Sequence, residues 1–156
     1  MNTRCFFTGH REAPESLYQS LYNAVLRHAE DHSVDEFIVG KYGNFDAMAA
    51  KAVIQVKNLY PSIRLTLLCP YHPAVREYVL EDGFDEAFYP FSKPVPMRFA
   101  IVRANLKAID ISDYLIAYAF HPGKARDFLE YAQKREKRGC IRTENLWEAI
   151  EGKVSL

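Results

Sequence analysis

The stretch Val39-Gly40-Lys41-Tyr42-Gly43-Asn44-Phe45-Asp46 joins a strand-like run to a helix-like run, and it indicates the class of fold. Residues 36–39 are β-prone and mostly apolar, which predicts a short buried strand. Apolar residues recur with helical spacing from Phe45 to Val56, which predicts a helix packed on a sheet. Asn44 stands where an N-cap residue is expected. Gly40 and Gly43 stand where the backbone turns sharply or approaches another segment.

A strand, a glycine turn and a capped helix together suit a phosphate or carboxylate ligand. Free N–H groups and the positive end of the helix dipole point to one place there. The spacing of the two glycines matches neither the dinucleotide-binding fingerprint nor the P-loop, so this stretch alone is explained more simply as an ordinary turn. Asp46, in the first helical turn, either responds to the dipole or holds ribose hydroxyls.

The composition is that of an ordinary globular protein, and 156 residues predict a single domain over residues 1–156. The formal net charge is zero, so no overall field attracts nucleic acid or membrane. No apolar run is long enough to span a membrane, and the three cysteines lack metal-binding spacing and fit free thiols. We therefore expect a cytoplasmic protein with no metal, no cofactor, no membrane association and no nucleic-acid partner.

Strand-like and helix-like segments alternate along the chain with short connections. This predicts an α/β protein with a Rossmann-like three-layer sandwich: a mostly parallel sheet of five or six strands with helices on both faces. Besides the central pair, we predict strands near residues 5–7, 63–69, 85–91, 113–120 and 140–142, and helices after Pro14, at 74–80, after Pro96, from 125 and at 144–152. The predicted buried face of the helix after Pro96 consists of Phe99, Val102, Leu106 and Ile109.

Parallel strands with right-handed crossovers place every strand-to-helix loop at one edge of the sheet. In an order such as 3-2-1-4-5, a ligand binds near the reversal between the first and fourth strands. The loops that meet there are residues 8–11, 40–46 and 121–124, and each contains a glycine. His10, in the first loop, either acts on a phosphate as donor or acid, or bonds to nearby backbone.

Two segments resemble motifs of the YpsA-like branch of the SLOG superfamily: Cys5-Phe6-Phe7-Thr8-Gly9-His10-Arg11 is similar to CFFTGHR, and the stretch from Val39 to Asp46 is similar to VGxxGNFD. Residues 113–118 resemble the SDxxIAY strand, and the similarity covers about residues 4–145. This Rossmann-like superfamily includes the LOG cytokinin-activating hydrolases and DprA. The resemblance implies a nucleotide or nucleotide-derived ligand at the carboxyl edge of the sheet.

In the LOG hydrolases, a PGGxGTxxE segment binds phosphate at a helix start, and its glutamate works on the glycosidic bond with an arginine from the preceding helix. Residues 122–130 match that segment at Pro122, Gly123 and Glu130 but differ at its other two glycines and its threonine. Arg103 and Asn105 lie where relatives carry an RxN motif. These departures favour binding over hydrolysis.

Two functions follow from the resemblance. The first is a sensing or regulatory module that binds a nucleotide without turning it over. The second is a phosphoribohydrolase-like N-glycosidase acting on nucleoside 5′-monophosphates, with Glu130 at the anomeric carbon and Arg103 holding the phosphate or orienting Glu130. By spacing alone, Glu130 is an exposed helix residue and Arg103 belongs to a surface ion pair with Asp110. Whether the protein is an enzyme is open at this point.

The other expectations concern partners and the remaining site residues. The neutral charge disfavours DprA-like DNA binding, and analogy with related folds suggests a homodimer. The implied ligand-binding residues are Thr8, Gly9, His10, Arg11, Gly40, Gly43, Asn44, Asp46, Asn105, Pro122, Gly123 and Lys124.

Overall fold

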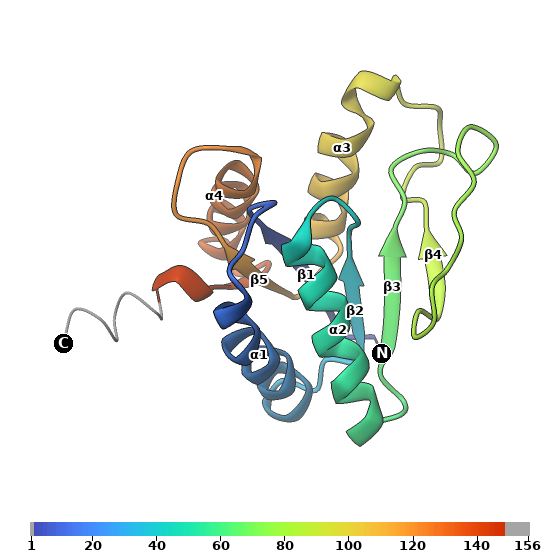
Figure 1. Cartoon of the computed structure of the whole chain (residues 1–156). Helices are drawn as coiled ribbons and strands as arrows, with labels where there is room; N and C mark the ends of the chain where they lie inside the picture. The colour runs from blue at the N-terminus through green and yellow to red at the C-terminus, as the bar shows by residue number, and fades with distance from the viewer. Residues whose placement is uncertain (1, 149–156) are drawn as a thin grey trace.

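The computed structural model describes residues 2–148 and contains a six-stranded sheet in the order β4-β3-β2-β1-β5-β6 (Figure 1). Every neighbouring pair of strands is parallel. In chain order, the elements are β1 Arg4–Gly9, the short 3-10 helix η1 Glu15–Leu17, α1 Tyr18–Asp31, β2 Glu36–Val39, α2 Asn44–Leu59, β3 Arg64–Leu68, β4 Glu86–Phe88, α3 Met97–Asp110, β5 Tyr114–Tyr118, α4 Lys124–Glu136 and β6 Arg142–Asn145. The predicted α/β three-layer sandwich is confirmed.

Consecutive residues of the central strands pack on opposite faces of the sheet, as the strand period of two requires. Phe7 of β1 and Phe37 of β2 lie in the core formed with α1 and α2. Phe6 and Ile38 lie in a second core formed with α3 and α4. The helices α1 and α2 lie together on one face of the sheet (Figure 1).

The position of the strand reversal differs from the expected one. The fourth strand in the chain, β4, is a short outer strand beside β3, and the fifth, β5, pairs with β1. Burial explains the difference: β5 is buried along nearly its whole length, whereas β4 is largely exposed and so belongs at an edge. The reversal therefore lies between β1 and β5, where ligands bind in folds of this kind.

Several local predictions are wrong. Residues 74–80 form a short turn followed by irregular chain instead of a helix. The predicted terminal helix begins later than expected: Glu144 and Asn145 belong to β6, residues 146–148 are helical, and the rest of the predicted helix lies outside the described residues. In α3, Phe99 and Val102 are exposed, whereas Ala100, Ala104, Ala108 and Ile109 are buried. The alanines and Ile109 form the face of α3 that packs in the core, and the larger Phe99 and Val102 lie on the outer side of the helix.

Among residues 2–148, no helix combines the length and the apolar character that crossing a membrane requires.

Candidate site at the carboxyl edge of the sheet

The carboxyl ends of β1, β2 and β5 meet at one edge, as expected, but the predicted residues there have different roles. Thr8 and Gly9 are part of the sheet, where they pair with Ala117 and Tyr118 of β5. A Cβ atom on Gly9 would lie 2.4 Å from the ring of Phe45. Gly9 therefore serves the close packing of α2 on β1, and Thr8 is a buried residue of the sheet.

The turn between β2 and α2 is fastened to the loop after β1. The N–H of Asn44 donates to the carbonyl of Arg11 at 2.9 Å. The Asn44 side chain accepts from the N–H of Ala13 and donates to its carbonyl, both at 2.7 Å. Gly43 is therefore the N-cap of α2, and Asn44 is its first helical residue. The side-chain amide of Asn44 holds the loop after β1 in place. The predicted cap is wrong because the partner lies 31 residues away in the sequence.

His10 is buried, and it binds the loop that follows β5. Its ring Nε2 accepts the N–H of Phe120 at 2.9 Å, and the backbone N–H of His10 donates to the carbonyl of Tyr118 at 3.1 Å. Its ring stacks on that of His121, with 3.6 Å between centroids. Since Nε2 accepts, the neutral ring carries its proton on Nδ1. The structure therefore favours the backbone-bonded role for His10.

An aromatic stack lies directly beyond His10. Phe120 is 42% exposed, and its ring stacks on Trp147 with 4.2 Å between centroids. The side chain of Asn145 bonds to both the N–H and the carbonyl of Ala119, which fixes the loop from its other side. The sequence offered Phe120, but not Trp147, as an aromatic on which a base could stack, with a lid over the core as the alternative. The signal for Phe120 is its position just after β5, the strand that pairs with β1 at the reversal.

Pro122, Gly123 and Lys124 follow at the amino end of α4, and all three are exposed. Gly123 has a φ of 152°, and a Cβ there would meet nothing within 4 Å. Glycine at this position thus serves the backbone conformation, not close packing. The first N–H groups of α4 have no acceptor inside the helix, which begins four residues after Phe120.

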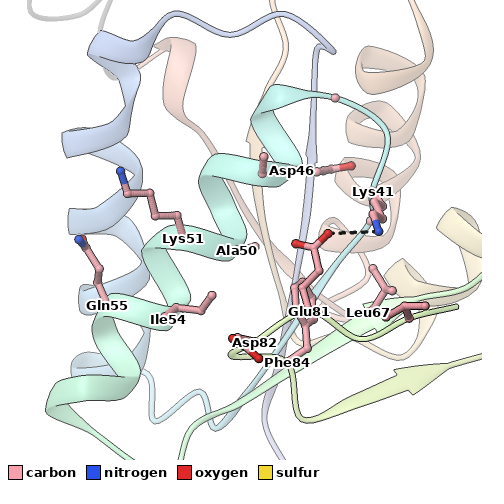
Figure 2. A pocket seen from close by; sticks show the side chains of 14 residues that line it. Lys41, Asp46, Ala50, Lys51, Ile54, Gln55, Leu67, Glu81, Asp82 and Phe84 are labelled. Carbon is pink, nitrogen blue, oxygen red and sulfur yellow. Dashed lines mark ion pairs between the residues drawn. The ribbon is translucent and has the colours of Figure 1, made fainter.

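Gly40 and Asp46 belong to a different place. Together with Gly43 they line a cavity between α2 and residues 79–84 (Figure 2). No residue of the loops at 8–11 or 118–124 lines that cavity. The three predicted loops therefore share an edge, but they do not converge on one pocket.

The residues implied for N-glycosidic chemistry each contact another residue. Glu130 is exposed and pairs with Arg126 at 3.3 Å, while the guanidinium of Arg103 lies 5.3 Å from the ring centroid of Phe99. Within residues 2–148, Arg103 and Glu130 form no ion pair, and Asp110 pairs with Arg135 rather than with Arg103. Asn105 donates to the carbonyl of Ile101 in its own helix. The glycosidase function stays a prediction that this arrangement does not support.

In the described part of the chain, no group of three or more His, Cys, Asp or Glu side chains is placed to hold a metal ion.

A stability measurement can test the neutral state of His10. Burial, followed by the nearby His121, lowers the pKa of His10 below its usual 6.5. The unfolded chain therefore takes up the proton first, so the stability that His10 contributes is present above about pH 6.5 and is lost as the pH falls. We expect wild type to lose free energy of unfolding relative to His10→Gln between about pH 7.5 and 5, because glutamine accepts the same N–H without titrating. A difference that stays constant in urea titrations across this range would contradict the assignment.

The sequence matches no protein-family model, and no characterised protein matches it significantly. The structure does have a match. It is similar to DNA processing protein A from Helicobacter pylori, which binds single-stranded DNA, with a TM-score of 0.58 and 13% identity over 98% of this chain and 80% of that one. The two chains share a fold. The match agrees with the predicted Rossmann-like architecture, while the YpsA-like branch stays a prediction.

This similarity corrects our prediction about nucleic acid. The zero net charge led us to disfavour a nucleic-acid partner, but a protein of the same fold binds single-stranded DNA. Total charge is a poor guide here, because contacts with single strands depend on local cations and on aromatic rings against which bases stack.

Proposed function

We propose that the edge between β1 and β5 binds a nucleotide unit, either free or within a single strand. The base would stack against the Phe120–Trp147 pair, and the phosphate would meet the amino end of α4. The observation that carries this proposal is the half-exposed aromatic stack, which lies at the strand reversal and is fixed by His10 and Asn145.

The energies of the two contacts are suited to such a ligand. Stacking of a base on an aromatic side chain contributes about 1–3 kcal/mol. The free N–H groups of α4 attract an anion. Two exposed cations add positive charge: Lys124 at the start of α4 and Arg11 in the loop after β1. A rigid stack also limits the ordering that binding requires, because the loop is already held from both sides.

The resemblance to the SLOG motifs and the fold shared with DNA processing protein A both agree with this ligand class. Binding is the better-supported activity, because Glu130 pairs with Arg126 and makes no ion pair with Arg103 within residues 2–148. The proposed role is therefore a binding or sensing module of the YpsA-like type, without cleavage of the ligand.

Trp147 gives a direct test, since it is the one tryptophan in the sequence. We expect AMP, GMP, ADP-ribose, NAD or a short oligothymidylate to quench its fluorescence and to raise the thermal midpoint. Ribose 5-phosphate, which has no base, separates the two contacts because it should stabilise the protein without stacking. Quenching by mononucleotides alone indicates a free ligand, and salt-sensitive quenching by the oligonucleotide alone indicates a single strand. If none of these compounds quenches the fluorescence or raises the thermal midpoint, the proposal is refuted.

Phe120→Ala should weaken binding of the best ligand by about tenfold, which corresponds to the loss of one stacking contact. Phe99→Ala is the matched control, because Phe99 is 40% exposed but lies on α3. The ratio of dissociation constants from fluorescence titration measures the effect. Equal affinity in the two variants would show that the base does not stack on Phe120.

A further inference from the structure

A separate cavity of about 370 Å³ lies beside α2, on the side that faces residues 79–84 (Figure 2). Its walls are mainly apolar. The apolar lining consists of Ala47, Ala50, Ile54, Leu67, Val79 and Phe84. A cavity of this size and character suits a small organic molecule with an apolar body.

One carboxyl group of this cavity has an oxygen available for a ligand. Asp46 is half-buried in the first turn of α2, and its Oδ2 accepts the N–H of Tyr42 at 3.1 Å. Within the described residues, its Oδ1 makes no hydrogen bond. A carboxylate can accept several hydrogen bonds, so a ligand with an N–H group can bind Oδ1 without displacing Tyr42.

The positive and amide side chains around the cavity have other partners. Lys51 points away from the cavity and places its Nζ 5.0 Å from the ring centroid of Tyr18 (Figure 2). The Oε1 of Gln55 accepts from the hydroxyl of Tyr18. Lys41 pairs with Glu81 at 3.3 Å. In the described part of the chain, Asp46, Asp82 and Lys51 are the charged lining residues without an ion-pair partner, and of these only the cation is directed to an aromatic ring outside the cavity.

We propose that this cavity binds a small organic amine, with its apolar part against the wall of α2 and its ammonium group on Asp46 Oδ1. The apolar lining selects the body of the ligand, and the unneutralised carboxylates select a positive charge. Burial raises the pKa of Asp46 to about 6, so the carboxylate is mainly charged at neutral pH in a poorly hydrated place. A cationic ligand offsets that loss of hydration.

Three probes of similar size and different charge test the site: benzylamine, benzyl alcohol and benzoate. We expect benzylamine at millimolar concentration to shift the backbone amide signals of residues lining the cavity in a saturable way, and the neutral and anionic probes to bind at least tenfold more weakly. Equal shifts with all three, or no saturable shift with benzylamine, would overturn the proposal.

Variants assign the contacts. Asp46→Asn should weaken benzylamine binding at least tenfold, and Ala50→Phe, which fills the cavity, should abolish it. Asp31→Asn removes the same charge at the exposed end of α1 and should leave binding unchanged. Thermal unfolding confirms that each variant is folded. Benzylamine that binds Asp46→Asn as well as wild type would refute the role of Asp46, whatever the nucleotide titrations show at the other site.

Discussion

Gly43→Ala is expected to destabilise the protein by about 2–4 kcal/mol, because there is no room for a side chain where the turn after β2 meets the loop after β1. A Cβ at this position would lie 2.6 Å from the Cα and 2.8 Å from the carbonyl oxygen of Arg11. The neighbouring atoms belong to the backbone of Arg11, so they cannot avoid the new Cβ by a side-chain rotation, and the two loops must move apart. That separation also weakens the bonds that Asn44 makes to Arg11 and Ala13.

The thermal midpoint measures this effect, and for a chain of this size it should fall by roughly 5–15 °C. Gly139→Ala is the control. Gly139 has a φ of 78° and nothing within 4 Å of an added Cβ, so alanine there meets only the cost of the left-handed backbone, about 1–2 kcal/mol. If the Gly43 variant were as stable as the Gly139 variant, the close contact between the loops would not exist in solution.

Asp46→Asn is expected to have the opposite effect and to stabilise the protein by about 1–3 kcal/mol at pH 7.5. Burial raises the pKa of Asp46 from 3.8 to about 6, against a smaller lowering by the N–H of Tyr42. Ionisation at neutral pH is therefore less favourable in the folded chain than in the unfolded one. Asparagine keeps an oxygen for Tyr42 and carries no charge.

The pH dependence identifies the cause. The folded state binds the proton more tightly than the unfolded state, so the stability of wild type rises as the pH falls through about 6 toward 3.8. The advantage of the asparagine variant should consequently shrink between pH 7.5 and about 4.5 in urea titrations. Asp31→Asn, at an exposed position, should change stability by less than about 0.5 kcal/mol at either pH. An advantage that is independent of pH would mean that charge is not its source.

A more stable variant that no longer binds benzylamine would also connect stability with function. Half-buried carboxylates that raise the free energy of the folded state are expected at binding sites, where ligand contacts compensate for them. Asp46 is therefore a candidate for function because its charge is unfavourable without a ligand.

Local sequence patterns determined the layers of this protein. The apolar run at residues 36–39 forms β2, and the helix predicted after Pro14 forms as α1, where Leu21, Val25 and His28 recur with helical spacing on the buried face. Alternating strands and helices also implied that the loops after β1, β2 and β5 lie at one edge. These features follow from periods of two and 3.6 residues, which are properties of neighbouring residues along the chain.

The tertiary structure alone decided what the residues at that edge do. The sequence indicated Asn44 as a helix cap, yet its side chain bonds to Ala13 in another loop. It left His10 either to act on a phosphate or to bond nearby backbone, and the ring accepts the N–H of Phe120, which is 110 residues away in the sequence. The stack of Phe120 on Trp147 and the separation of Asp46 from Gly123 likewise depend on which strand lies beside β1. That choice follows from the burial of whole strands: β5 is buried along nearly its whole length and pairs with β1, while the exposed β4 remains at the edge. Local periodicity predicts each strand but not its neighbour, because strand order is set by the burial of many residues distant in sequence.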